Sequence, residues 1–285
     1  MRPLDVLIGA AFAGVVALVA WRAHALTRSG AIAAFVVGTL TYAAGTIGFT
    51  LILLAFFASS VVLSRIGRSR KRALTDIGKA GARDALQVLA NGGIATACAV
   101  GFAFTHDARW ALAFAGAYAA ATADTWATEL GTLWGKAPRS IVNFKPMATG
   151  MSGGVTLIGT GAEIAGALWM GVFAPLGILL AYMANGADFG WASNAPSVIG
   201  IGVREIAVVP LAGIVGATAD SLLGATLQEL RRCDACDRTC ETDPHACGNP
   251  TRLVRGIRGV SNDVVNLAAT AAGAAVAVVL PSILR

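Results

Sequence analysis

The chain has 285 residues, of which 56% are hydrophobic and 13% are charged, and its formal net charge is +6. Soluble domains average about 25% charged residues, so this composition excludes a disordered or nucleic-acid-wrapping chain and argues against a water-soluble globule. Together with a mean hydropathy of +0.68, it predicts an all-α, polytopic bundle of transmembrane helices in a lipid bilayer. The basic residues are then loop residues that face anionic lipid, with no nucleic-acid partner.

A bilayer core needs about 20 apolar residues per helix. By that rule we expect about eight spans, near residues 4–21, 30–45, 47–64, 85–104, 110–134, 153–183, 205–224 and 263–282. The first has a single arginine before it and no small-residue cleavage site after it, so we interpret it as a span. Residues 184–204 form either a loop or a partly re-entrant segment. No repeat or linker divides the chain, which predicts one domain over residues 1–285.

Charged loops indicate how the spans are oriented. The loop over residues 65–84 is strongly basic and is therefore predicted to be cytoplasmic. The cysteine-rich loop over residues 225–260 also falls inside if residues 153–183 cross once, and outside if they cross twice. A single crossing agrees with every basic loop, so we predict eight spans, both termini outside, and a location in the cell inner membrane.

Polar clusters lie at the cytoplasmic ends of five predicted spans, in residues 78–93, 123–131, 149–154, 219–228 and 261–266. Random placement would divide them between the two faces of the membrane. The clustering predicts a single site that faces the cytoplasm.

Four carboxylates fall within predicted spans, where an ionised carboxylate costs several kcal/mol unless it is paired or bound to a metal. Asp124 and Asp220, on separate helices, favour a divalent-metal or proton-handling site, although each alone could equally be a structural group. Glu129 lies about 140° around a regular helix from Asp124, so both face one ion only if the helix loosens. Glu163 is alone among glycines and is expected to be structural.

A glycine-bearing segment suggests a phosphate site. Ser152, Gly153 and Gly154 are expected to open a helix, whose free N–H groups suit an anion. Close helix packing explains the glycines equally well when they are considered alone. Three cations are predicted on the same face, which favours phosphate binding, and these are Lys79, Arg83 and Lys145.

Asparagines also border the predicted site. Asn91 precedes a glycine pair and indicates either tight packing or a contact to substrate. Asn262 and Asp263 either cap the last helix or face the site.

The cysteine-rich loop contains Cys233, Cys236 and Cys240, followed by His245 and Cys247. Thiolates with a nearby histidine suit zinc, and a reducing cytoplasm favours metal over disulfide. The spacing is compressed and lacks paired CxxC motifs. A structural zinc ion on Cys233, Cys236, Cys240 and Cys247 and a loop of free thiols therefore both remain open.

Four ordered motifs carry a resemblance that runs from Lys71 to Leu280. They are RDALQVLANGG, ADTWATELG, SGGVTLIGTGAEIAG and DSLLGATLQ, with HACG as a smaller marker. Together they resemble the integral-membrane family that contains plant phytyl-phosphate kinase and the animal transmembrane protein nineteen.

The resemblance implies transfer of a phosphoryl group from a nucleoside triphosphate, with CTP as one candidate, to a prenyl monophosphate. For this reaction our hypothesis assigns Mg²⁺, held directly or through water, to Asp124, Glu129 and Asp220, and neutralisation of the transferring phosphate to Lys79 and Arg83. Binding of phosphate, nucleotide or head group falls to Asn91, Lys145, Ser152, Gly153, Gly154, Ser221, Asn262 and Asp263.

Two other functions compete with the kinase. A cytidylyltransferase that forms a CDP-lipid needs the same carboxylates, Mg²⁺ and basic face. A lipid or anion transporter also uses intramembrane carboxylates and glycine-rich helices, but it should place them near the midplane between inverted repeats.

Overall fold

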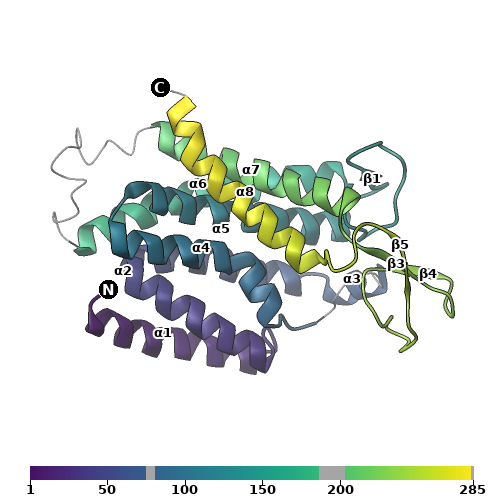
Figure 1. Cartoon of the computed structure of the whole chain (residues 1–285), viewed down its shortest axis with the longest axis horizontal. Coiled ribbons are helices and arrows are strands. Elements are labelled where there is room, and N and C mark those ends of the chain that lie inside the picture. The colour runs from purple at the N-terminus through teal and green to yellow at the C-terminus, as the bar shows by residue number, and fades with distance from the viewer. Residues whose placement is uncertain (75–80, 186–202, 284–285) are drawn as a thin grey trace.

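The computed structural model describes residues 1–74, 81–185 and 203–283. Long helices pack side by side into a bundle, and the short strands gather at one end of it, which we call the loop end (Figure 1). The helices are α1 (Pro3–Arg22), α2 (Arg28–Arg65), α3 (Arg68–Leu74), α4 (Ala85–Thr105), α5 (Ala108–Trp134), α6 (Leu157–Asn185), α7 (Val203–Thr226) and α8 (Asn262–Ile283).

Six helices in the described part of the chain are long and apolar enough to cross a membrane, and α5 is the one long helix outside that set. Helix α2 passes through the bundle twice, because Thr46 has non-helical backbone angles (φ 54°, ψ −145°) that divide it into two parts. Arg65, at the far end of α2, donates a hydrogen bond to the carbonyl of Ala23, just before its start. In residues 1–74, 81–185 and 203–283, seven long helices, one of them folded back, make eight passes, in agreement with the about eight spans that the sequence predicts.

Helix α5 is the centre of the bundle, in contact with α2, α4, α6, α7 and α8. Its buried stretch consists largely of alanine and glycine. A Cβ on Gly116 would lie 2.5 Å from the carbonyl oxygen of Gly273 on α8. Helices in lipid associate through van der Waals contact, which small residues permit by letting backbones approach. The acidic residues of α5 are therefore surrounded by other helices.

Helix α6 crosses once, with Pro175 inside it, as the sequence predicts. It begins at Leu157, so the expected helix start near residue 153 is wrong. Residues 186–202, most of the segment with two interpretations, lie outside the described part of the chain. Both chain ends lie at the end of the bundle opposite the strands (Figure 1).

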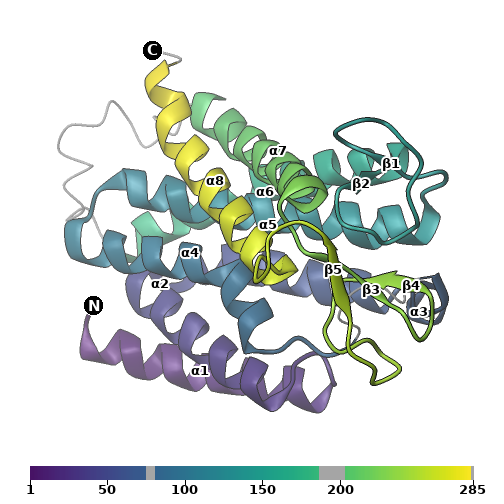
Figure 2. The same ribbon diagram turned by 45° about the vertical axis from the view of Figure 1, so that its right-hand side comes forward.

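Two small sheets at the loop end were not expected. In one, β1 (Arg139–Ser140) pairs with β2 (Gly154–Val155). The predicted loop over residues 225–260 contains the other, an antiparallel sheet in the order β4-β3-β5. Its strands are β3 (Leu230–Cys233), β4 (Arg238–Cys240) and β5 (Arg252–Arg255), and Figure 2 shows them beyond the ends of α7 and α8.

Candidate functional site at the loop end

A polar cavity of about 400 Å³ lies at the loop end, between helices that are distant in sequence. It is lined by eleven of the residues that the sequence singles out, namely Arg83, Asn91, Asp124, Glu129, Ser152, Gly153, Gly154, Asp220, Ser221, Asn262 and Asp263. The polar ends of α4, α5, α7 and α8 therefore meet in one space, together with the segment before α6.

Arg83 is held at the cavity by its own backbone. Its N–H donates to the carbonyl of Ala25, and its carbonyl accepts from the N–H of Thr27. The next residue, Asp84, begins α4 with a capping box, in which its side chain and that of Gln87 satisfy each other's backbone N–H groups. Burial lowers the pKa of the Arg83 guanidinium, and the charge of Glu129 opposes that shift. Arg83 thus forms part of a fixed, basic wall.

Another part of the cavity lining is acidic. Asp124 of α5 interacts electrostatically with Glu163 of α6 and with Asp220 of α7. The hydroxyl of Thr218 donates a hydrogen bond of 3.1 Å to Glu163, which also lines the cavity. In the described part of the chain, Asp220 Oδ2 is buried without a hydrogen-bond partner. Carboxylates that interact with one another in a low-dielectric interior favour a bound cation.

Glu129 has a partner of its own. Its carboxylate forms an ion pair with Lys71, which also donates to the carbonyl of Leu63 at 2.7 Å. Both side chains of the pair are mostly buried. Helix α5 continues without interruption past Asp124, so the two carboxylates keep different directions. The ion pair therefore accounts for Glu129, and its expected place beside Asp124 on one ion is not supported.

The loop after β4 brings an unpredicted acidic residue into the cavity. Glu241 accepts hydrogen bonds from the backbone N–H and the hydroxyl of Ser152, both at 3.0 Å, and from Gln228 Nε2 at 2.8 Å. Burial raises the pKa of Glu241, and the Ser152 bonds and the charge of Arg255 oppose that shift. Glu241 also interacts electrostatically with Asp220.

The segment Ser152–Gly154 does not open a helix. Gly153 has a left-handed backbone (φ +82°), and a Cβ there would lie 2.5 Å from Ala225 of α7. Thr156 caps α6 instead, accepting a hydrogen bond from the N–H of Gly159. The packing against α7 explains Gly153, and a carboxylate, that of Glu241, fills the anion contact at Ser152.

The other two predicted cations are Lys79 and Lys145. Lys79 lies outside the described residues. Lys145 is exposed in the loop between β1 and β2 and is not among the cavity residues. Arg65 and Arg68 line the cavity beside Arg83 instead. They belong to the predicted basic loop, and their position at the end of a span was the available signal.

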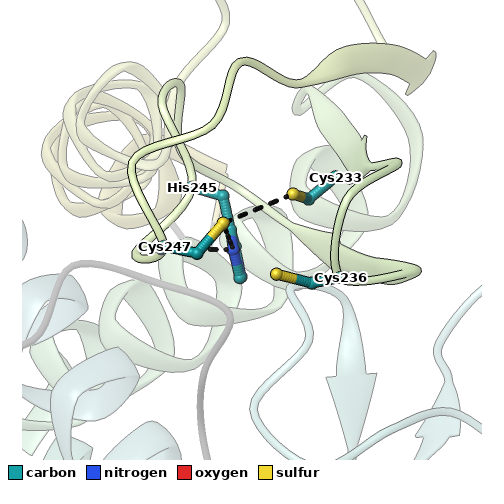
Figure 3. Close-up of side chains that lie close together, drawn as sticks. All are labelled: Cys233, Cys236, His245 and Cys247. Atoms are coloured by element: carbon teal, nitrogen blue, oxygen red, sulfur yellow. Dashed lines mark hydrogen bonds between the residues drawn. The ribbon is translucent and has the colours of Figure 1, made fainter.

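The cysteine-rich region brings four metal-binding side chains together. Ligand atoms of Cys233, Cys236, His245 and Cys247 all lie within 4.8 Å of one another, and the side chains converge in Figure 3. Cys240 lies outside this group, with its thiol directed to the carbonyl of Thr242. The expected ligand set is therefore wrong at one position, where His245 replaces Cys240.

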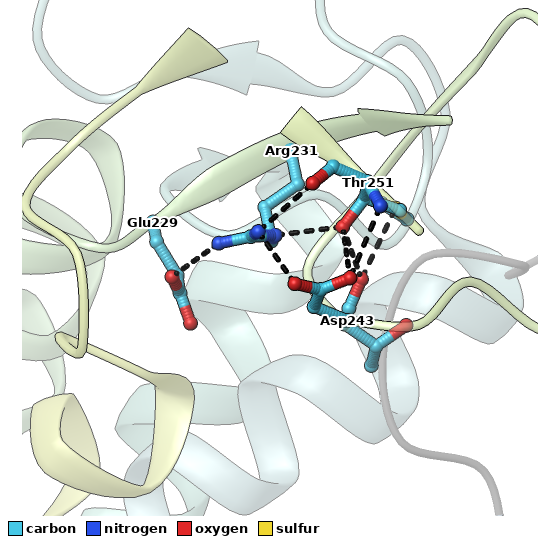
Figure 4. A network of polar contacts seen from close by, with 6 residues as sticks. Glu229, Arg231, Asp243 and Thr251 are labelled. Carbon is cyan, nitrogen blue, oxygen red and sulfur yellow. Dashed lines mark hydrogen bonds and ion pairs between the residues drawn. The ribbon is translucent and has the colours of Figure 1, made fainter. Parts of the chain in front are cut away.

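A buried arginine holds the same region to the sheet. Arg231 of β3 forms ion pairs with Glu229 and with Asp243, at 3.0 and 2.7 Å. Its Nε also donates to the hydroxyl of Thr251 (Figure 4). The network ties β3 to the segments on both sides of His245 and Cys247.

Two acidic residues of the cavity, Glu163 and Glu241, were not predicted from the sequence to take part in its chemistry. Glu163 lies within one of the resembling motifs, which was the available signal. Glu241 lies in a polar loop, where a carboxylate needs no explanation, so the sequence carries no sign of its burial.

The sequence as a whole matches known membrane proteins. The model of the family described as Integral membrane protein DUF92 matches residues 11–274. Protein PGR of Arabidopsis thaliana is 32% identical, over 85% of this chain and 84% of its own. An uncharacterized membrane protein of Methanocaldococcus jannaschii is 32% identical, over 75% and 79%.

A second Arabidopsis thaliana relative, Protein VTE6, chloroplastic, is 26% identical over 90% of this chain and 65% of its own. No solved structure matches the chain. The family match spans nearly every helix of the bundle and all four motifs that line the cavity. The chain therefore belongs to the integral membrane family DUF92.

Proposed function

We propose that this protein is a prenyl-phosphate kinase, which transfers a phosphoryl group from a nucleoside triphosphate to a prenyl monophosphate. The observation that carries the proposal is a single cavity lined by both acidic and basic side chains, with Asp124 and Asp220 among the acidic ones and Arg83 among the basic ones. The resemblance of its motifs to the family of plant phytyl-phosphate kinase supports the same reaction.

The acidic wall fits magnesium. Mg²⁺ is usually held by one or two carboxylates together with substrate phosphates and water. Asp124 and Asp220 offer two such carboxylates from different helices, and the buried Oδ2 of Asp220 has no hydrogen-bond partner among the described residues. Mg²⁺ held there would neutralise charge on the phosphate oxygens.

The basic wall suits the phosphates themselves. Phosphoryl transfer needs little from a protein beyond positioning and neutralisation of oxygen charge. An oxygen of the lipid monophosphate attacks the γ-phosphorus, the bond to the β-phosphate oxygen breaks, and the nucleoside diphosphate leaves. In this proposal Arg83, with Arg65 and Arg68, binds the phosphate oxygens, while Asn91 and Asn262 orient the head group or nucleotide.

A second cavity, of about 70 Å³, would hold the part of the prenyl tail nearest the phosphate. It lies between α1, α2 and α4 and is lined mainly by apolar side chains, among them Phe12, Val16 and Phe57. It shares Arg83, Gln87 and Asn91 with the polar cavity. A substrate with a phosphate head and an apolar tail would occupy both, with the head at the shared residues.

The cavity is proposed to face the cytoplasm, where nucleoside triphosphates are available. The support is that the basic segments around Arg65, Arg139 and Arg231 all lie at the loop end, as the positive-inside rule requires of a cytoplasmic face.

Product analysis tests the proposal. Purified protein is incubated with Mg²⁺, a panel of nucleoside triphosphates, and phytyl or geranylgeranyl monophosphate, and the lipids and nucleotides are identified by mass. A kinase gives lipid diphosphate and nucleoside diphosphate. Pyrophosphate with a CDP-lipid would establish the cytidylyltransferase instead, and flux of lipid phosphate in proteoliposomes without nucleotide would establish the transporter.

A further inference from the structure

We propose that Cys233, Cys236, His245 and Cys247 bind one zinc ion, and that this site holds Glu241 in the polar cavity. Three sulfurs and an imidazole nitrogen form a donor set typical of structural zinc. The four side chains come from the end of β3, the turn after it and the loop before β5, and they point toward a common centre (Figure 3).

The distances between the proposed ligand atoms can be compared with those around a tetrahedral zinc ion. With Zn–S bonds of about 2.3 Å, tetrahedral geometry places two sulfur ligands about 3.8 Å apart. The sulfurs of Cys233 and Cys247 are 3.6 Å apart. His245 Nδ1 lies 3.1 Å from the sulfur of Cys247, shorter than the roughly 3.5 Å that zinc bond lengths give for a nitrogen and a sulfur at a tetrahedral angle.

Cys240 provides an internal comparison. It lies in the same region and is buried at the end of β4, but its thiol is directed to the carbonyl of Thr242 at 3.5 Å. All of the cysteines in this region are free thiols. The geometry thus separates three ligands from one cysteine that is not a ligand.

The consequence for the cavity follows from chain connectivity. Glu241 lies in the segment that joins Cys236 to His245, so a metal bound by both closes this segment into a loop. The loop carries Glu241 to the N–H and hydroxyl of Ser152. Since Glu241 also acts electrostatically on Asp220, zinc would fix the position of one acidic group in the cavity.

Metal analysis of the full-length protein tests the site independently of the proposed kinase activity. Protein purified in detergent without added chelator is assayed for zinc by mass spectrometry. We expect about one zinc ion per chain in the wild type and in C240S, and loss of zinc in C236S. Absence of zinc from wild-type protein produced in zinc-supplemented medium, or equal loss in C240S and C236S, would overturn the site.

Cobalt exchange keeps the site testable if C236S does not fold. Wild-type protein in which Co²⁺ replaces zinc should show the intense absorption of tetrahedral cobalt bound to thiolates, and C240S should show the same spectrum. A spectrum of octahedral, oxygen-bound cobalt would contradict the ligand set.

Hydrogen exchange tests the link to the cavity. The amide of Ser152 is protected through Glu241, which accepts its hydrogen bond. We expect removal of zinc from the wild type to increase exchange at Ser152, as would C236S, whereas C240S should keep wild-type protection. Unchanged exchange at Ser152 after loss of zinc would show that the metal does not position Glu241.

Discussion

Asp124 and Asp220 lie on neighbouring helices of a membrane bundle, where both are partly buried and line one cavity. Their mutual repulsion and that of Glu163 and Glu241 must be offset by a cation or by protonation. Arg83 supplies positive charge to the same cavity, and a divalent ion between the carboxylates would supply the rest. The cost of burying these groups made Asp124 and Asp220 predictable from sequence.

Replacing Lys71 alone should destabilise the protein more than replacing both Lys71 and Glu129. K71M removes the ion-pair partner of the mostly buried Glu129 carboxylate, and we expect a loss of about 3 kcal/mol in the free energy of unfolding. Adding E129Q should restore much of that loss. Thermal unfolding of detergent-solubilised K71M, E129Q and the double variant measures the effect, and equal destabilisation by K71M and the double variant would contradict it.

Helix α1 contributes to the apolar cavity that is proposed to hold the prenyl tail, so a substitution in α1 tests this proposal. Val16 lines the apolar cavity, whereas its neighbour Val15 is exposed on the outer face of the helix. V16W fills the cavity, so we expect it to raise the KM for a long prenyl monophosphate at least several-fold with little change for the nucleotide. V15W is the matched control and should behave as the wild type. Equal KM values for the two variants would show that the tail binds elsewhere.

The packing of α2 against α6 depends on one close approach. A Cβ at Gly48, just after the reversal at Thr46, would lie 2.1 Å from the carbonyl oxygen of Gly177, whereas a Cβ at Gly161 would meet nothing within 4 Å. We expect G48A to destabilise the protein by about 1–3 kcal/mol, and G161A to leave it unchanged or stabilise it by up to about 1 kcal/mol. Thermal unfolding in detergent compares the two, and similar stability would refute the packing argument.

The elements were predictable to different degrees for physical reasons. Each span is a long apolar stretch, and even the tight reversal at Thr46 was marked by the lack of a loop between two such stretches. The start of α6 was missed because Ser152–Gly154 resembles a helix start, while packing of Gly153 against Ala225 decides its conformation. The sheet of β3, β4 and β5 was missed because its strands are too short and too polar for a periodic signal.

Distant parts of the chain build the site, and this limits what sequence can reveal. Arg83 and Asp263 were predicted to share one end of the bundle, and they line one cavity. The sequence did not predict which residues contact one another within that end. The ion pair of Lys71 with Glu129, the position of Glu241 in the cavity, and the place of His245 rather than Cys240 in the cysteine cluster depend on how the loops fold.

The orientation of the whole molecule is testable by labelling. Asn143 is exposed in the loop between β1 and β2, and Thr105 is exposed at the opposite end of the bundle. With a membrane-impermeant thiol reagent, we expect N143C to be labelled only in inverted vesicles and T105C only in intact cells, with labelled peptides identified by mass. The reverse pattern would place the cavity on the outer face.

Asp124 and Asp220 are proposed to act together in one phosphoryl transfer. The most direct test follows labelled γ-phosphate from the preferred nucleoside triphosphate into prenyl diphosphate, in the wild type, D124N, D220N and the control D107N, which caps α5 at the opposite end. We expect label in the lipid with wild type and D107N. With D124N and D220N we expect the rate of transfer to fall at least about 100-fold, which corresponds to about 2.7 kcal/mol in transition-state stabilisation. All four proteins should be folded. Near-normal transfer by D124N and D220N would contradict this proposal.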